Sequence, residues 1–374
     1  MFASLVLLHV QPALALCSQP AARHYTLGLE RDRESDEASA LRHFAAAACD
    51  EHAAALDAVA ARCEWVARAP SAEIGALACS VLARGGYIGP VRCGVNADGV
   101  RGLFATADVA PGMPLLAVPS ACTLCAAASG SGVDSAVADG HGAAGLGTAT
   151  HEALMVELLR ARAAASTADV ATAGHARYLA ALPETVELLR DWSAEELAAL
   201  RCDELAARAR TQREWAQRTV ASVSKACEAM GVPCDDAAVE WAERIVRSRA
   251  VQDSDAASGA RALRLVPLLD LANHRGAEVA AAEPPVAPIL HMADGMIALC
   301  ATGPLKRGDE VTFAYREGMY AHMCTPSCVC HAHGMHTQVT FAYREGITDA
   351  ELLLDYGFAE RVRRGEAMPP APPR

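Results

Sequence analysis

The chain has 374 residues, of which 52% are hydrophobic and 21% charged, and its formal net charge is -12. It is long enough for two compact units or one large unit with insertions, with ample apolar surface for a core. Binding nucleic acid through its phosphates needs a basic face, which this acidic sequence lacks. We therefore expect no nucleic-acid partner. A protein partner is expected instead, because a basic segment of that protein would complement the acidic charge of this chain.

The 14 cysteines stand mostly singly in apolar, alanine-rich segments. Single cysteines of this kind are usually small buried hydrophobes, and the spacing does not resemble a dense disulfide framework. The pattern favours a reducing compartment and leaves the cytoplasm and the plastid open.

Residues 1–22 have the outline of a cleavable signal, with an apolar run from Ala3 to Val10. The basic start of such a signal is missing, because the first arginine or lysine is Arg23. A targeting peptide and a simple apolar N-terminus both remain open. The run is too short to span a membrane, and no membrane partner is expected.

Residues 23–73 are expected to form an N-terminal helical extension. Within it, residues 30–68 alternate charge and alanine at helical spacing, which predicts one or two exposed helices. Residues 91–118 have a pattern typical of strands and turns, with a tight turn predicted at Pro111 and Gly112. Residues 127–149 are rich in Gly, Ser and Ala and predict a loop.

Helical signals follow from residue 151 to Arg249. Ser193 and Glu196 form a capping-box pattern at the start of one helix. Asp236 is the predicted N-cap of the helix that ends at Arg249.

Strand signals return after Arg264. Residues 296–300 and 311–315 read as a hairpin-like pair around a turn at 304–308. A capping box, Thr348 with Glu351, opens a last helix that Gly357 ends. Strands, then a helical block, then strands again indicate an α+β protein whose sheet is interrupted by a helical insert.

Four groups of motifs, in order, resemble one family. They are GVRGLFAT from Gly99; YLAALP from Tyr178; Trp241-Ala242 with Ser248-Arg249; and PLLDLANH from Pro267 with Gly308-Asp309-Glu310-Val311 and Asp355-Tyr356-Gly357-Phe358. Together they resemble SET-domain protein methyltransferases of the Rubisco large-subunit lysine methyltransferase type, over roughly residues 74–360.

The resemblance implies a SET fold of small β-sheets with a knot-like C-terminal crossing. It divides the chain into an N-terminal SET part (74–126), a helical insert (127–264), a C-terminal SET part (265–360) with a duplicated segment (319–346), and a tail (361–374). Members usually carry a helical substrate-binding domain after the SET unit. Because this chain stops at Arg374, that domain is expected to be missing.

The activity that the resemblance implies is S-adenosyl-L-methionine-dependent transfer of a methyl group to a lysine amine of a non-histone protein, by a monomer. Two alternatives stay open. One is methylation of a protein histidine on the same fold. The other is an inactive SET scaffold, disabled by the duplicated segment and the missing substrate domain.

The resemblance also assigns residues. The cofactor-binding set is Gly99, Arg101, Gly102, Leu103, Ser248, Arg249, Asp270, Asn273, His274 and Phe358, and the catalytic set is Tyr343, Tyr315 and Tyr356. Glycines allow a close backbone approach, and an arginine can clamp the cofactor carboxylate. The plainer alternatives are an ordinary turn at the glycines, a solvated helix-end arginine and a core histidine.

The eight residues VTFAYREG occur twice, at 311–318 and at 339–346. Tyr315 has the family's distance from Gly308, whereas Tyr343 has its distance to Phe358. In the family one tyrosine has both of these sequence distances. Removing one repeat unit from this chain would restore the family's spacing. Tyr343 is favoured as the catalytic tyrosine because it is continuous with the helix that leads to Phe358.

Cysteine and histidine are dense between the two copies: Cys324, Cys328, Cys330, His331, His333 and His336. Such residues could bind zinc, but their spacing is not a recognisable paired-ligand pattern. We expect an extruded loop and no metal site, with an incorrectly assembled gene sequence as a further alternative.

Overall fold

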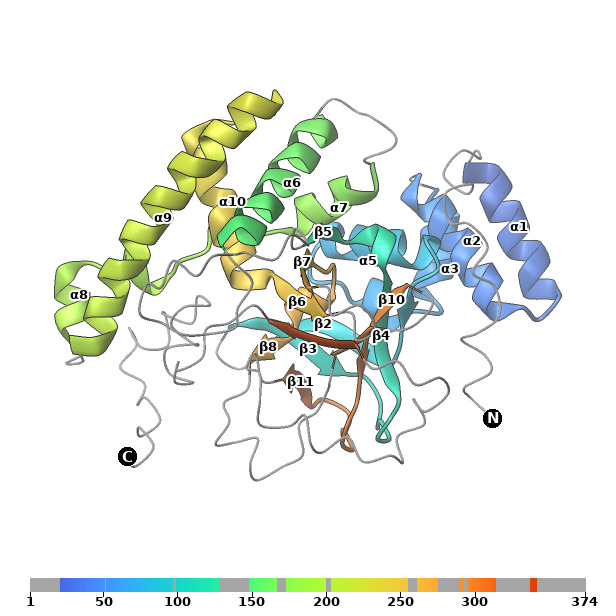
Figure 1. The fold of residues 1–374 in the computed structure, drawn as a ribbon. Helices are drawn as coiled ribbons and strands as arrows, with labels where there is room; N and C mark the ends of the chain where they lie inside the picture. Colours follow the sequence, from blue (N-terminus) through green and yellow to red (C-terminus); the bar gives the residue numbers. More distant parts are fainter. Residues whose placement is uncertain are drawn as a thin grey trace.

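The computed structural model describes residues 21–50, 52–96, 99–127, 148–166, 173–199, 203–254, 261–274, 289–291, 295–313 and 337–341. It confirms the α+β class, with helices packed on two small sheets (Figure 1). Several predictions fall outside these residues: the N-terminal apolar run, most of the glycine-rich segment, the helix after Ile347, and the knot-like crossing.

The N-terminal helices are α1 (Ala21–Arg33), α2 (Glu37–Cys49), α3 (Ala53–Ala60), α4 (Glu64–Ala67) and α5 (Ala72–Ala83). The prediction of exposed helices here is wrong for α2, whose Phe44, Ala45 and Ala47 are buried. Helix α1 comes so close that a Cβ on Gly28 would lie 2.6 Å from the Phe44 ring. Alanine and glycine therefore serve helix-to-helix packing in this region.

The strands among the described residues form an eight-stranded and a four-stranded sheet. The larger sheet has the order β1 (Tyr87–Ile88), β4 (Pro114–Pro119), β10 (Met296–Cys300), β9 (Ile289–His291), β12 (Thr337–Phe341), β6 (Val251–Ser254), β7 (Arg261–Leu265) and β5 (Leu124–Ala127). The smaller has the order β2 (Val91–Val95), β3 (Arg101–Ala105), β11 (Glu310–Phe313) and β8 (Asn273–His274).

The predicted hairpin of residues 296–300 with residues 311–315 is wrong. Strand β10 pairs with β4 and β9, whereas β11 pairs with β3 and β8 in the other sheet. All five residues of β10 are buried. The turn reverses the chain, as its Gly308 at φ +94° allows. A turn signal does not determine with which strands the two flanking segments will pair. The pairing depends on which strands bury both faces of each segment in the folded core.

The segment predicted as a helical insert, residues 127–264 and called the insert below, contains helices α6 (Thr148–Ser166), α7 (Ala173–Ala181), α8 (Ala194–Ala199), α9 (Asp203–Met230) and α10 (Asp236–Arg249). The Ser193–Glu196 capping box is confirmed, with the Ser193 amide donating to Glu196 at 2.8 Å and the Glu196 amide donating to the Ser193 hydroxyl at 3.2 Å. The predicted N-cap of α10 is wrong by one residue: Asp235 accepts from the Ala238 amide at 2.7 Å.

Strands return before Arg264, contrary to the prediction, because β6 and β7 both lie within residues 251–265. Strand β7 pairs with β5, so that Leu124 lies opposite Leu265. The two ends of the insert are thus hydrogen-bonded neighbours. An insertion whose ends meet in one strand pair can be added without breaking the sheet.

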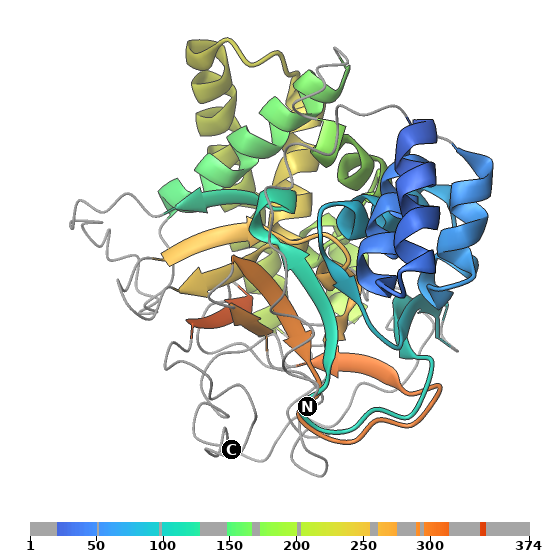
Figure 2. The same cartoon turned by 90° about the vertical axis from the view of Figure 1, so that its right-hand side faces the viewer.

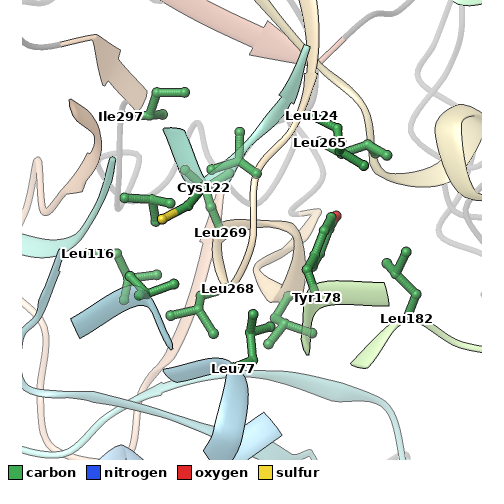
Figure 3. Close-up of a cluster of buried hydrophobic side chains, with 14 of the residues drawn as sticks. Leu77, Leu116, Cys122, Leu124, Tyr178, Leu182, Leu265, Leu268, Leu269 and Ile297 are labelled. Atoms are coloured by element: carbon green, nitrogen blue, oxygen red, sulfur yellow. The ribbon is translucent and has the colours of Figure 1, made fainter. Parts of the chain in front are cut away.

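The main core joins the N-terminal helices and the helices between residues 148 and 249 to strands of both sheets. Figure 2 shows how these helices lie beside the strands. Figure 3 shows part of this core, with Leu77, Leu116, Leu268, Leu269 and Ile297 converging from helix, strand and turn. Each is at most 2% exposed. Burying one such side chain contributes about 1.5–3 kcal/mol, so this cluster holds α5 and the turn at Leu268 against the larger sheet.

Candidate functional site

The smaller sheet brings distant segments of the chain together. Strand β11 is antiparallel to β3, with Val311 opposite Leu103, and parallel to β8, with Thr312 opposite Asn273. Parallel neighbours need a long connection, and here it runs from β8 to β11. Segments of the chain near residues 100, 273 and 310 therefore lie side by side.

Gly102, Asn273 and Glu310 form a close-packed unit in this sheet. The Asn273 side-chain amide donates to the Arg101 carbonyl at 3.0 Å and to Glu310 Oε1 at 2.7 Å. A Cβ on Gly102 would lie 2.6 Å from Glu310 Oε1 and 2.7 Å from Asn273 Nδ2. The glycine therefore permits a close approach, but the groups that approach it are the side chains of Asn273 and Glu310. The predicted approach to a cofactor stays a prediction.

A strained turn precedes Asp270. The Leu269 amide donates to the Pro267 carbonyl at 2.8 Å, which closes a three-residue turn around Leu268 at φ +66°. This conformation is rare and strained for a residue with a side chain. Leu268 is fully buried in the core, and that packing holds the turn. The turn carries the chain into the short helix η4 (Leu269–Leu271), which contains Asp270.

Asp270 binds two donors from the helical insert. Its Oδ2 accepts from the Tyr178 hydroxyl at 2.9 Å and from Arg249 Nη1 at 3.2 Å, and Arg249 Nη1 also lies 3.1 Å from its carbonyl oxygen. The side chains of Asp270 and Arg249 are 3% and 15% exposed. A charge pair this deeply buried loses its hydration, so each partner depends on the other.

Arg101 brings a second guanidinium to Asp270. Burial, together with the positive charge of Arg249, lowers the pKa of Arg101 despite the opposing effect of Asp270. Among the described residues its side chain has no hydrogen bond or ion pair, and Arg249 Nε is buried there without an acceptor. Two arginines and one carboxylate leave this cluster with a net positive charge, which favours an anionic group.

The remaining assigned residues have different surroundings. Gly99 is in a turn at φ +80°, where an added Cβ would meet nothing, so its role is conformational. Leu103 is fully buried in the core. The Ser248 hydroxyl donates to the Arg244 carbonyl of its own helix at 2.8 Å. The backbone of His274 lies in β8 beside Phe313.

Tyr315, Tyr343, Tyr356 and Phe358 lie outside the described residues. The strands that begin the two VTFAYREG copies are described, and they lie in different sheets. The first copy enters β11, beside β8, whereas the second enters β12, where Phe341 pairs with Val251. Identical local sequences thus have different partners.

Tyr178 and Glu310 were not predicted as site residues, although both lie in motifs of the resemblance. Both bind an assigned residue through a side-chain hydrogen bond. For Glu310 the available sequence signal was its position next to Asp309 at the start of a strand. For Tyr178 it was a single tyrosine in an apolar helix. Neither pattern indicates a polar contact by itself.

The described residues contain no group of three or more His, Cys, Asp or Glu able to hold a metal ion. The cysteine- and histidine-rich segment 324–336 lies outside them. Within the described part of the chain, no helix combines the length and apolar character needed to cross a membrane.

No family model matches the chain, and no curated protein matches it. Solved structures do. The SET domain of LSMT bound to lysine and AdoHcy is similar at 21% identity and a TM-score of 0.48, covering 67% of this chain and 55% of that one. Rubisco LSMT bound to AdoMet is similar at 19% identity and a TM-score of 0.46, covering 66% of this chain and 53% of that one. The chain thus spans about half the length of these structures.

Proposed function

We propose that this chain is an S-adenosylmethionine-dependent protein-lysine N-methyltransferase that acts on a non-histone protein. When bound, S-adenosylmethionine supplies a methyl group on a cationic sulfonium, which a neutral amine can accept. The residues of this chain would bind that molecule, orient the amine and exclude water.

The cluster of Arg101, Arg249 and Asp270 is the observation that carries the proposal. The amino-acid end of the cofactor has one carboxylate and one ammonium group, and the cluster offers guanidinium and carboxylate groups in one largely buried place. The buried Arg249 Nε has no acceptor among the described residues, and a carboxylate is its natural partner. A second cation at Arg101 adds to the attraction.

The Gly102 unit fits the same ligand. With Asn273 bonded to the Arg101 carbonyl, the backbone of β3 is held against β8. Because Asn273 and Glu310 fill the space over Gly102, this unit would act by fixing the backbone beside Arg101. We assign Asn273 and His274 to cofactor binding on this basis, with Gly99, Leu103 and Ser248 as supporting positions and Phe358 as the aromatic face for adenine.

The acceptor lysine must lose its proton before it can react. At a reference pKa near ~10.4, deprotonation at pH 7 costs about 4–5 kcal/mol. A buried site next to a cation lowers that cost. We assign the orienting hydroxyl to Tyr343 or Tyr315, with Tyr356 beside it. The net charge of -12 favours a substrate segment that is basic.

Calorimetric titration of the purified chain with S-adenosylmethionine tests the proposal. We expect one site with an affinity between about 1 μM and 1 mM, the usual range for enzyme substrates. Heat no greater than that of dilution would contradict both enzyme functions and leave the inactive scaffold. If binding occurs, mass spectrometry of methylated proteins from a treated lysate separates lysine from histidine acceptors, and only methyl-lysine supports the proposal.

A further inference from the structure

Tyr178 connects the helical insert to the site. It lies on α7, its side chain is 1% exposed, and its hydroxyl donates to Asp270 Oδ2 at 2.9 Å. The same oxygen accepts from Arg249 Nη1 at 3.2 Å. Two donors from different helices of the insert therefore hold one carboxylate oxygen.

Helix α7 is anchored by two adjacent residues, and these contacts place the hydroxyl of Tyr178. The neighbouring Arg177 donates through its guanidinium to the Cys49 carbonyl at the end of α2. The Tyr178 ring packs with Leu77, Leu182 and Leu268 in the core (Figure 3). Adjacent residues thus anchor α7 in two directions, toward the N-terminal helices and toward the site.

The tyrosine is well suited to act as a permanent donor. Burial raises the pKa of Tyr178 well above its ordinary value, and the negative charge of Asp270 raises it further. The phenol therefore stays protonated over the whole working range. A permanently protonated phenol can donate to Asp270 Oδ2 and hold that side chain in one rotamer.

We propose that Tyr178 is a positioning residue, which fixes the Asp270 carboxylate and through it the Arg249 guanidinium that binds the amino-acid end of the cofactor. The inference rests on the proposed function and adds a residue and a role to it. Without the hydroxyl, Oδ2 keeps only Arg249, and the carboxylate can rotate. The guanidinium then loses its fixed orientation toward the incoming carboxylate.

Two ligands separate positioning from general damage. S-adenosylhomocysteine carries the amino-acid end, whereas methylthioadenosine has the adenosine and sulfur but lacks that end. We expect Tyr178→Phe to weaken S-adenosylhomocysteine binding about tenfold, equal to about 1.4 kcal/mol, and to leave methylthioadenosine binding unchanged. Tyr87→Phe, which removes a hydroxyl from β1 in the larger sheet, is the matched control and should change neither affinity.

Equal weakening of both ligands in Tyr178→Phe would overturn the inference, because it indicates loss of packing, and so would unchanged S-adenosylhomocysteine binding. Should that variant fail to fold, Asp270→Asn keeps the tyrosine in place and tests the same contact. It should show the same selective loss, and equal affinities for wild type and variant would overturn the inference. If the wild type binds neither ligand, the proposed function fails as well, a result distinct from any difference between variants.

Discussion

Asn273 Nδ2 lies 2.7 Å from Glu310 Oε1, and the two atoms fill the space in which a side chain at Gly102 would begin. Three strands that are far apart in the sequence are thereby joined at one point. The Asn273 amide also reaches the Arg101 carbonyl, so the backbone next to the guanidinium pair depends on the same contact. Changes at Gly102 should therefore affect both folding and ligand binding.

Gly102→Ala is expected to lower the free energy of unfolding by about 1–3 kcal/mol, the usual cost of overpacking a well-packed place. It should also weaken S-adenosylmethionine binding at least about tenfold, because Asn273 must move. Urea denaturation and calorimetry measure the two effects. The matched control is Gly75→Ala in α5, where an added Cβ would lie 3.4 Å from Ala69. That change should leave stability equal or raise it by up to about 1 kcal/mol. Full stability and affinity in Gly102→Ala would refute the close approach.

Removing one partner of the buried ion pair of Arg190 and Glu243 should strongly destabilise the protein. The two side chains are 6% and 0% exposed. Burial alone would raise the pKa of Glu243, but the hydrogen bond from Arg190 and the charge of Arg247 outweigh it and lower the pKa. Glu243→Gln is expected to cost about 3–5 kcal/mol, because it leaves a buried cation without its partner.

The double variant Arg190→Met with Glu243→Leu is the control for that prediction. Replacing both charges by apolar groups of similar size removes the penalty of a lone charge, so most of the lost stability should return. Chemical denaturation of the wild type, the single variant and the double variant compares them directly. A double variant as unstable as the single one would contradict this account.

Stability should fall as the pH drops through the histidine range. Burial lowers the pKa of His151 to about 4, with Arg247 and Arg190 contributing and Glu243 opposing. The folded state thus favours the neutral ring, so the stabilisation is complete above pH 6.5 and is lost between about 6.5 and 4. The loss from this residue is on the order of 3 kcal/mol.

His151→Gln should reduce that dependence without abolishing it, because burial also lowers the pKa values of His43 and His175. Thermal melts at pH 7 and pH 5 give the comparison. The same decrease in melting temperature in the variant and the wild type would argue against His151.

The roles of the two VTFAYREG copies can be distinguished by removing one tyrosine hydroxyl at a time. We expect Tyr343→Phe to lower methyl transfer more than Tyr315→Phe, because Tyr343 keeps the family spacing to Phe358. Initial rates with each variant, at saturating S-adenosylmethionine, are the measurement. The opposite order would assign the role to the first copy, whose strand β11 pairs with β8 at the site.

Local features could be predicted from the sequence where their cause lies within a few residues. The capping box of Ser193 and Glu196 is confirmed because both partners are on one turn of one helix. The N-cap of α10 was misplaced by one residue because Asp235 and Asp236 are both good caps. The hairpin of residues 296–300 with 311–315 was wrong because strand partners depend on tertiary burial.

By itself the sequence determined the α+β class and singled out the glycine, asparagine, aspartate and arginine that the smaller sheet, η4 and α10 contain. Only the tertiary structure decided that Tyr178 binds Asp270, that Glu310 fills the space over Gly102, and that the two identical copies begin strands in different sheets. The physical reason is the range of the interactions. Caps and turns depend on backbone groups next to them in the chain, whereas a buried hydroxyl or carboxylate takes its partner from whatever the packed core brings within hydrogen-bond distance.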